Sequence, residues 1–444
     1  MLPLDVSLEF DSANDERFFA GLPSRPGVLL VEMRAANAQP YLARTSDLRR
    51  AAERLLRPAE TNSKRLNLRD VAARVRYRAT GSKFEQIVTL YGQAREHFPQ
   101  RYQAVMRLRP PAVLKVNLRN EYPRCYVTRG IRADSGFYVG PFQSRRAAEA
   151  FAEGFLDLFR IRRCQIKIRR DPSYPGCIYS EMKMCLAPCF AACTKDEYEA
   201  EAGRVLATLD TAGAWLKENL EQEREAASEA LDFERAAGIH KRLEKVAAAL
   251  RPLPELARPI SHLDAIILQR GAEEKTIIAF PVRAGILNEP IFLRFGEISS
   301  EPRSVEMMLR ERLAPETIVR LAKEKKRTTF PAPDAGAAAE ARGAAEPAEA
   351  ADAATMSEPA ETKVKNPEDF RAKYGLHAAP PELAEHLTML ARWFYSKPRD
   401  GEIFFREADW PYRRILRACA RLLGLGAAPR RKVQQAPDEA KESS

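Results

Sequence analysis

The chain lacks the features that mark a secreted or membrane-embedded protein. Its first residues, MLPLDVSLEFDSANDERF, contain no basic segment followed by an apolar core, so no signal peptide is expected. No apolar run approaches the length that spans a bilayer. Cysteine is rare, at 7 of 444 residues, and disulfides would need an oxidising compartment that nothing here indicates. We therefore expect a cytoplasmic protein with reduced thiols and no membrane contact.

The few cysteines are clustered, because five of them lie between positions 164 and 193. Four follow the spacing C-x12-C-x7-C-x3-C and are Cys164, Cys177, Cys185 and Cys189. In a reducing compartment such a cluster favours a metal over cystine. Zinc modules usually carry two tight pairs, whereas a four-thiolate iron–sulfur centre tolerates uneven spacing, so iron–sulfur is slightly favoured. Nearby cations should lower the thiol pKa values and offset the centre's negative charge. They are Arg162, Arg163, Lys167, Arg169, Arg170 and Lys183.

Positive charge is concentrated in one stretch of the chain. Residues 101–170 contain 16 Lys and Arg but 5 Asp and Glu, an excess that equals the formal charge of +11 of the whole chain. Such a concentration suits a polyanion such as DNA or RNA. The alternative is a solvated basic face without a partner.

A helical hairpin is expected within 195–250, where the sequence is rich in Ala, Glu and Arg. The segment Leu231-Asp-Phe-Glu-Arg-Ala-Ala237 interrupts the charged helix. Asp232 should cap the second helix, with Phe233, Ala236 and Ala237 facing inward. A hairpin of this size cannot bury its apolar stripe alone, so it docks either within this chain or on a partner's hairpin.

The order of motifs resembles the N-terminal part of the UvrC family, a component of the bacterial nucleotide-excision-repair excinuclease. The cysteine region and the hairpin carry the most specific likeness, which covers about residues 20–300. The matching segments are Ser24-Arg-Pro-Gly-Val28, Pro40-Tyr-Leu-Ala-Arg44, Asp47-Leu-Arg-Arg50, Tyr138-Val-Gly-Pro-Phe142, Leu158-Phe-Arg-Ile-Arg-Arg-Cys164, Cys185-Leu-Ala-Pro-Cys189, Leu231-Asp-Phe-Glu-Arg-Ala-Ala237 and Leu263-Asp-Ala-Ile266.

This resemblance implies cofactors and partners. The four spaced cysteines would hold a [4Fe-4S] cluster, with zinc less favoured, and Cys193 would stand outside the set. The hairpin would be a UVR motif that contacts a UvrB-like protein through Leu231, Phe233, Ala236 and Ala237. DNA would be bound by cations on the first two domains, namely Arg44, Arg49, Arg50, Arg162, Arg163, Lys167, Arg169 and Arg170.

We expect an α+β, multidomain chain. The expected domains, in order, are a degenerate GIY-YIG nuclease-like small α/β domain (20–105), a basic Cys-rich iron–sulfur module (106–200), the UVR helical hairpin (201–250), a small α+β domain with an antiparallel sheet (260–325), a disordered Ala/Glu/Pro-rich linker (331–365) and a C-terminal helical module (366–428). No RNase H-like nuclease and no helix-hairpin-helix pair follows, although the family carries both.

The nuclease-like part departs from the family's catalytic pattern. Such a nuclease uses tyrosines, an arginine that steadies developing charge and a glutamate that binds one divalent cation. The family's pattern has a tyrosine in its first motif, a glycine after the tyrosine of its second motif, an arginine on the next helix and a glutamate on the helix after that. At these positions, in the same order, the chain carries Leu29, Ala43, Ala51 and Leu90. The second-motif tyrosine is Tyr41, and three further residues stand near the lost positions: Arg49, Arg50 and Glu85.

Three functions follow from these observations. The first is a non-catalytic scaffold of nucleotide excision repair that contacts DNA and a UvrB-like protein. The alternative is an active Mg²⁺-dependent endonuclease that cuts near DNA lesions, in which Tyr41, Arg49 or Arg50 and Glu85 assemble the site. The third is a redox-sensing regulator, for which the sequence offers no feature of its own. Enzymatic activity is therefore left open, and Mg²⁺ is implied only for the second function.

Overall fold

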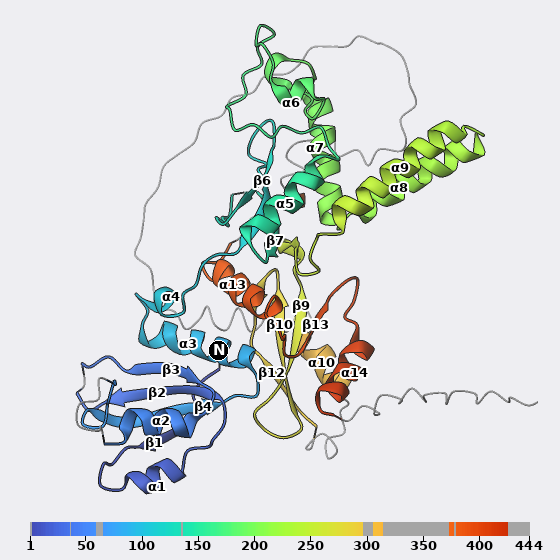
Figure 1. Cartoon of the computed structure of the whole chain (residues 1–444). Helices are drawn as coiled ribbons and strands as arrows, with labels where there is room; N and C mark the ends of the chain where they lie inside the picture. Colours follow the sequence, from blue (N-terminus) through green and yellow to red (C-terminus); the bar gives the residue numbers. More distant parts are fainter. Residues whose placement is uncertain are drawn as a thin grey trace, which may run out of the picture. The chain divides into compact units, whose positions relative to one another are not determined.

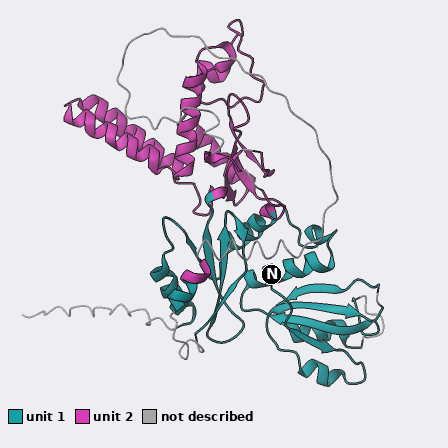
Figure 2. Cartoon of the chain, turned by 180° about the vertical axis from the view of Figure 1, so that it is seen from behind, with its two compact units in different colours: residues 1–109, 262–309, 385–444 teal, residues 110–261, 310–384 magenta. Residues whose placement is uncertain are grey.

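The structure is a computed structural model that describes residues 2–35, 37–58, 65–134, 136–295, 305–313, 373–376 and 379–424. These residues form two compact units, shown in separate colours in Figure 2. Unit 1 contains 1–109, 262–309 and 385–444, and unit 2 contains 110–261 and 310–384. The linker expected over 331–365 and a short helix expected over 318–323 lie outside the described residues.

Unit 1 begins with a four-stranded antiparallel sheet of order β1-β4-β2-β3 (Figure 1). Helices α1 and α2 share a hydrophobic core with one face of the sheet, and α3 packs against the other face. The side chains of Asp47 and Ser82 cap α2 and α3. The elements are β1 (Val6–Glu9), α1 (Asp15–Ala20), β2 (Gly27–Met33), β3 (Tyr41–Thr45), α2 (Leu48–Leu56), β4 (Ala72–Ala79), α3 (Lys83–His97) and α4 (Tyr102–Val105).

The first domain extends further toward the N-terminus than predicted. Strand β1 pairs with β4, and Phe18 and Phe19 of α1 belong to the core under α2. The predicted start at residue 20 is therefore wrong. Strand β1 is a short edge strand, and its sequence VSLE alternates over too few residues to be distinctive.

A second antiparallel sheet in unit 1 has the order β11-β10-β9-β13, and β12 also pairs with β10. Strand β13 comes from the far end of the chain, and Phe405 lies opposite Ala265 of β9. The predicted helical module over 366–428 is therefore wrong in two ways, since it contains a strand and is not separate. The elements are β9 (Ala265–Arg270), β10 (Thr276–Arg283), β11 (Ile286–Leu287), β12 (Ile291–Arg294), α10 (Val305–Leu313), α13 (Leu383–Phe394), β13 (Glu402–Phe405) and α14 (Tyr412–Leu422).

Unit 2 has a small antiparallel sheet of order β6-β5-β7-β8, covered by α5 and continued by three long helices (Figure 1). One hydrophobic core runs from the sheet through α5 to α7, α8 and α9. The elements are β5 (Ala112–Val116), β6 (Cys125–Thr128), β7 (Phe137–Phe142), α5 (Arg145–Leu156), α6 (Ile178–Glu181), η1 (Pro188–Phe190), α7 (Lys195–Asp210), α8 (Ala214–Glu229), α9 (Phe233–Leu250), β8 (Arg258–Pro259) and η2 (Ile260–His262), of which η2 runs into unit 1.

The α+β, multidomain class is confirmed, but the division into domains differs from the prediction. The segments 106–200 and 201–250, predicted as separate domains, share the core of unit 2. The hairpin itself is α8 and α9, and residues 201–210 belong to α7. Among the described residues, no helix combines the length and the apolar composition needed to cross a bilayer.

Candidate metal and nucleic-acid site

The four spaced cysteines lie in unit 2 on loops and short turns rather than on long helices. Cys164 follows α5, Cys177 is the N-cap residue of α6, and Cys185 and Cys189 stand before and within η1. Ala187 and Ala191 have left-handed backbone conformations on either side of Cys189. The turn at Ala187 brings its N–H to 3.3 Å from the Sγ atom of Cys185. Backbone N–H groups aimed at sulfur are the contacts that tune iron–sulfur centres.

The four sulfurs share one electrostatic neighbourhood. The pKa of Cys185 is raised to about 11, mainly by burial and also by the charges that Cys164, Cys177 and Cys189 would carry, although the hydrogen bond from the Ala187 N–H lowers it. Burial also raises the pKa of Cys189, again with contributions from Cys177 and Cys164. The nearby cations were expected to lower these two pKa values, but both are raised, and burial is the largest cause of each shift.

The four cysteines have side chains of the type that binds a metal centre. Four mutually interacting thiols and sulfur-directed N–H groups have the chemistry of a four-thiolate site. Within the described ranges, however, no three His, Cys, Asp or Glu side chains already stand in metal-coordinating geometry. The residues therefore fit such a centre by type and neighbourhood, and both the iron–sulfur centre and the less favoured zinc stay predictions.

Cys193 is set apart from the other four. It belongs to the hydrophobic core of unit 2, and burial raises its pKa. Its carbonyl oxygen accepts a hydrogen bond from Arg170 at 3.0 Å. This placement agrees with a core residue rather than a ligand.

The basic residues around the cysteines divide into two groups. Arg162 is only 5% exposed, and its guanidinium donates to the carbonyl oxygens of Tyr122 at 2.8 Å and Ile166 at 2.9 Å. It holds the Cys164 loop from inside, contrary to its predicted role in DNA binding. Arg163 is mostly buried and pairs with Asp157 at 2.8 Å. The remaining predicted cations of this loop are exposed, namely Lys167, Arg169 and Arg170.

The positions of the lost nuclease groups are filled by apolar side chains. Leu29 and Ala51 are buried in the core between the first sheet and α2, where Tyr41 also packs. Leu90 packs on the opposite face of the sheet with Val28 and other apolar residues of unit 1. These positions therefore do not converge on one polar site.

The predicted replacements are engaged elsewhere. Arg49 donates to the carbonyl oxygens of Leu22 at 2.8 Å and Ala20 at 3.4 Å, at the end of α1. Glu85 is 1% exposed and accepts from the Gly81 N–H at 2.8 Å and from Arg78 at 3.4 Å. In the described part of the chain, no hydrogen bond or ion pair joins any two of the remnants Tyr41, Arg49, Arg50 and Glu85.

The tip of the α8–α9 hairpin exposes apolar side chains. Leu231 has a left-handed conformation and is 73% exposed, and Phe233 is 65% exposed. Asp232 caps α9 by accepting from the Arg235 N–H at 3.0 Å, as predicted. The expectation that Phe233 and Ala237 face inward is wrong, since both are exposed, while Ala236 is half-buried against the core.

Part of unit 2 is similar to a known protein family. Residues 112–208 match the family described as UvrC/Cho excinuclease, middle domain. The resemblance to the UvrC family is confirmed. The matched segment starts at β5 and ends within α7, so it contains all four spaced cysteines. It stops short of the hairpin.

Several curated relatives are UvrABC system protein C from bacteria. The protein of Desulforudis audaxviator is 28% identical over 60% of this chain and 42% of its own length. The protein of Oleidesulfovibrio alaskensis is 28% identical over 60% of this chain and 38% of its own length. The protein of Moorella thermoacetica is 25% identical over 67% of this chain and 48% of its own length. The chain thus spans less than half of the length of these UvrC relatives. No solved structure matches the chain.

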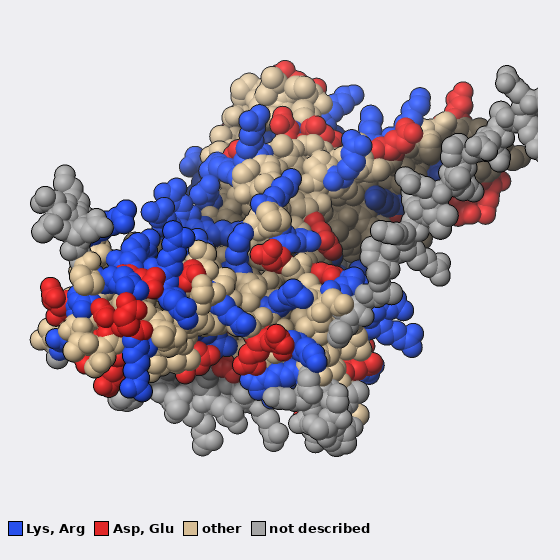
Figure 3. Space-filling model, turned by 60° about the horizontal axis from the view of Figure 1, so that its bottom comes forward, with Lys and Arg blue, Asp and Glu red and all other residues tan. Residues whose placement is uncertain are grey.

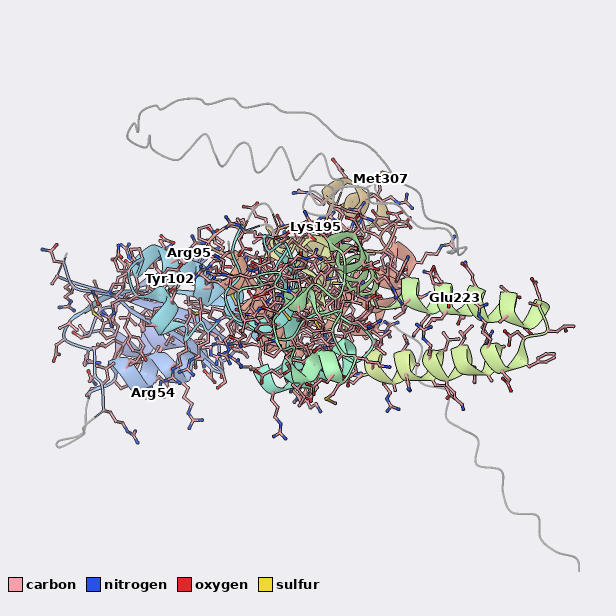
Figure 4. All side chains as sticks on the ribbon, turned by 90° about the horizontal axis from the view of Figure 1, so that it is seen from above. Arg54, Arg95, Tyr102, Lys195, Glu223 and Met307 are labelled. Carbon is pink, nitrogen blue, oxygen red and sulfur yellow. The ribbon has the colours of Figure 1, made fainter. Side chains whose placement is uncertain are left out.

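The sequence reasoning missed a buried polar network in unit 1. The Glu385 carboxylate on α13 accepts hydrogen bonds from Tyr91 on α3, from Tyr102 at 2.7 Å and from Gln103 at 2.7 Å. Arg95 lies over the rings of both tyrosines, and Figure 4 shows it close to Tyr102. No local motif joins residues nearly 300 positions apart, so the likeness to UvrC could not reveal this network.

Replacement of Glu85 by alanine tests its structural role. We expect a loss of about 1–3 kcal/mol in the free energy of unfolding, because Arg78 and the Gly81 N–H lose a buried partner. Urea unfolding followed by circular dichroism measures the change. Alanine at the exposed Lys83 of the same helix is the control and should have little effect. A Glu85 variant as stable as the parent but unable to bind Mg²⁺ would instead identify a metal ligand.

Proposed function

We propose that this chain is a UvrC-like DNA-binding protein of nucleotide excision repair that acts as a non-catalytic scaffold. It contacts DNA through cations on its surface and a UvrB-like protein through the hairpin tip. The observation that carries this proposal is the burial of Leu29 and Ala51 in an apolar core, where the family's nuclease pattern has a tyrosine and an arginine. The names of the relatives support the repair role.

The loss of catalytic groups argues against a cut by this chain. One contact that stabilises developing charge is typically worth about 10²–10³-fold in rate. The arginine and the metal-binding carboxylate are both replaced. Of the three nearby substitutes, only Arg50 has an exposed side chain without a hydrogen bond or ion pair among the described residues, while the carboxylate has no substitute free to bind a metal. Arg49 is bonded to backbone carbonyls, and Glu85 is buried beside Arg78. Mg²⁺ therefore has no role in the proposed function.

In the proposed function, the cysteine-containing loops of unit 2 position cations for contact with DNA. Cys164, Cys177, Cys185 and Cys189 would hold a [4Fe-4S] cluster, whose contribution here is to fix the loops between α5 and α7. Those loops carry few hydrogen-bonded elements of their own. The exposed Lys167, Arg169 and Arg170 would then present their charges to phosphates, which gives affinity without sequence readout.

An incision assay tests the proposal. Purified protein is incubated with a UvrB-like protein, Mg²⁺ and a duplex that carries a bulky lesion, and the products are separated by size. We expect duplex binding that weakens steeply with salt and no incision by the parent or by the Tyr41→Phe variant. Incision by the parent that disappears in Tyr41→Phe would establish the endonuclease alternative. Failure to bind duplex at low salt would remove the scaffold function.

A further inference from the structure

The C-terminal helix α13 is fastened to the first domain of unit 1 by a set of specific contacts. Glu385 binds the two tyrosines described above, and Trp393 packs against Phe84 of α3. Thr388 donates to the carbonyl oxygen of Arg109 at 3.1 Å. Arg392 donates to the carbonyl oxygens of Met106 at 3.0 Å and of Arg107. Helix α13 is therefore held against the segment that follows α4.

These contacts gather three exposed arginines from distant parts of the sequence. Arg44 lies on β3, Arg109 follows α4, and Arg392 lies on α13. Burial of part of the Arg392 guanidinium lowers its pKa, and the charges of Arg44 and Arg109 lower it further. The geometry agrees, because Leu42 of β3, Met106 and Met389 of α13 share one apolar cluster, and Arg44 is two residues from Leu42 on the same strand.

The three arginines also lack the carboxylate partners that other arginines of unit 1 have. Arg74 pairs with Glu9 at 3.0 Å, and Arg421 pairs with Glu402 at 2.6 Å. Among the described residues, no carboxylate pairs with Arg44, Arg109 or Arg392. On the face shown in Figure 3, lysine and arginine side chains gather in one region and are interspersed with carboxylates in others. Three guanidinium groups without a carboxylate partner repel one another, and an anionic ligand would relieve this repulsion.

We propose that Arg44, Arg109 and Arg392 form a phosphate-binding patch for the DNA backbone, built jointly by β3, the segment after α4 and the C-terminal helix α13. The inference rests on the proposed DNA-binding function and gives α13 a role in it. Guanidinium groups suit phosphate oxygens because their planar N–H groups bind two oxygens at once. The contacts of this patch would add affinity without reading bases.

The test compares two double variants of the full chain. The patch variant is Arg44→Ala with Arg109→Ala, because neither side chain makes a structural hydrogen bond among the described residues. The control variant is Arg74→Ala with Arg421→Ala, which removes the same charge from unit 1 but at arginines that carboxylates neutralise. Fluorescence anisotropy measures the dissociation constant for an unlesioned duplex over a salt series. Circular dichroism confirms that both variants fold.

The patch variant should bind roughly tenfold more weakly at low salt, and its slope of log affinity against log salt should fall by about 2. The control should change little in either quantity. Equal losses in the two variants, or an unchanged slope in the patch variant, would overturn the patch while the parent still binds duplex. A parent chain that fails to bind duplex would instead overturn the proposed DNA-binding function itself.

Discussion

Replacement of Cys185 by serine is expected to abolish the proposed iron–sulfur centre. Cys185 is one of the two buried thiols of the four, and it interacts electrostatically with each of the other three. A hydroxyl at this position removes one thiolate from a site that uses all four. We expect purification under anaerobic conditions to yield iron and acid-labile sulfide from the parent chain and almost none from the variant. The visible charge-transfer absorption should be lost together with them.

The matched control is Cys193→Ala. Cys193 lies four residues from Cys189 but is packed in the core of unit 2, so its loss should cost about 1 kcal/mol in stability and leave iron unchanged. Iron retained by the Cys185 variant and lost from the Cys193 variant would show that the ligand set is misassigned. A colourless parent that binds one zinc would replace iron–sulfur with a structural zinc site.

Release of the metal should also loosen unit 2. Between α5 and α7 the described loops hold only α6 and η1, each shorter than five residues. Two hydrogen bonds hold one end of this region against the segment that precedes β6. The Arg162 guanidinium donates to the Tyr122 carbonyl at 2.8 Å, and the Tyr198 hydroxyl donates to the Pro123 carbonyl at 2.8 Å. Chelation or oxidation of the centre should therefore increase proteolysis within 164–189 before the sheet itself unfolds.

Local sequence patterns predicted the elements that are amphipathic over many residues. The sequence predicts helices over 48–56 and 84–97, and the structure has α2 at Leu48–Leu56 and α3 at Lys83–His97. Both have a side-chain cap and a buried apolar stripe, which are signals that reside within about ten residues. Apolar residues in succession or alternation likewise predict strands over 71–79, 113–118 and 276–282, where the structure has β4, β5 and β10.

The assembly of these elements depended on contacts that no local pattern encodes. Strand β13 has only four residues, and it is recognisable only beside β9, to which it pairs across more than 130 positions. The Glu385 network likewise depends on α13 meeting α3. For the same reason, the basic stretch 101–170 looked like one surface in the sequence, whereas its first nine residues belong to unit 1 and the rest to unit 2.

Charge alone also misplaced some candidate residues. Arg162 and Arg49 were predicted to contact DNA because they are arginines beside functional motifs. Each instead donates its guanidinium protons to backbone carbonyls, which is the common way to satisfy carbonyls at loop and helix ends. Their long side chains reach inward as readily as outward. Only a structure distinguishes the two directions.

The largest effect on partner binding is expected at the hairpin tip. Alanine at both Leu231 and Phe233 should weaken binding of a UvrB-like protein by about 100-fold or more, because exposed aromatic and aliphatic anchors dominate such interfaces. Titration by biolayer interferometry with the purified partner measures the change. Glu223→Ala, on α8 of the same hairpin and away from the tip (Figure 4), is the control and should have little effect.

The same pair of residues distinguishes docking from internal packing. A side chain that packs inside the hairpin destabilises the fold when it is truncated, typically by about 2–5 kcal/mol. Leu231 and Phe233 are largely exposed, so their double variant should unfold at the same urea concentration as the parent. Ile239 is buried in the core of unit 2, and Ile239→Ala should show the opposite pattern, with lower stability. If the tip variant is fully folded and still binds the partner as the parent does, Leu231 and Phe233 are not the partner-binding residues. Because folding does not depend on them either, they would then serve a different contact.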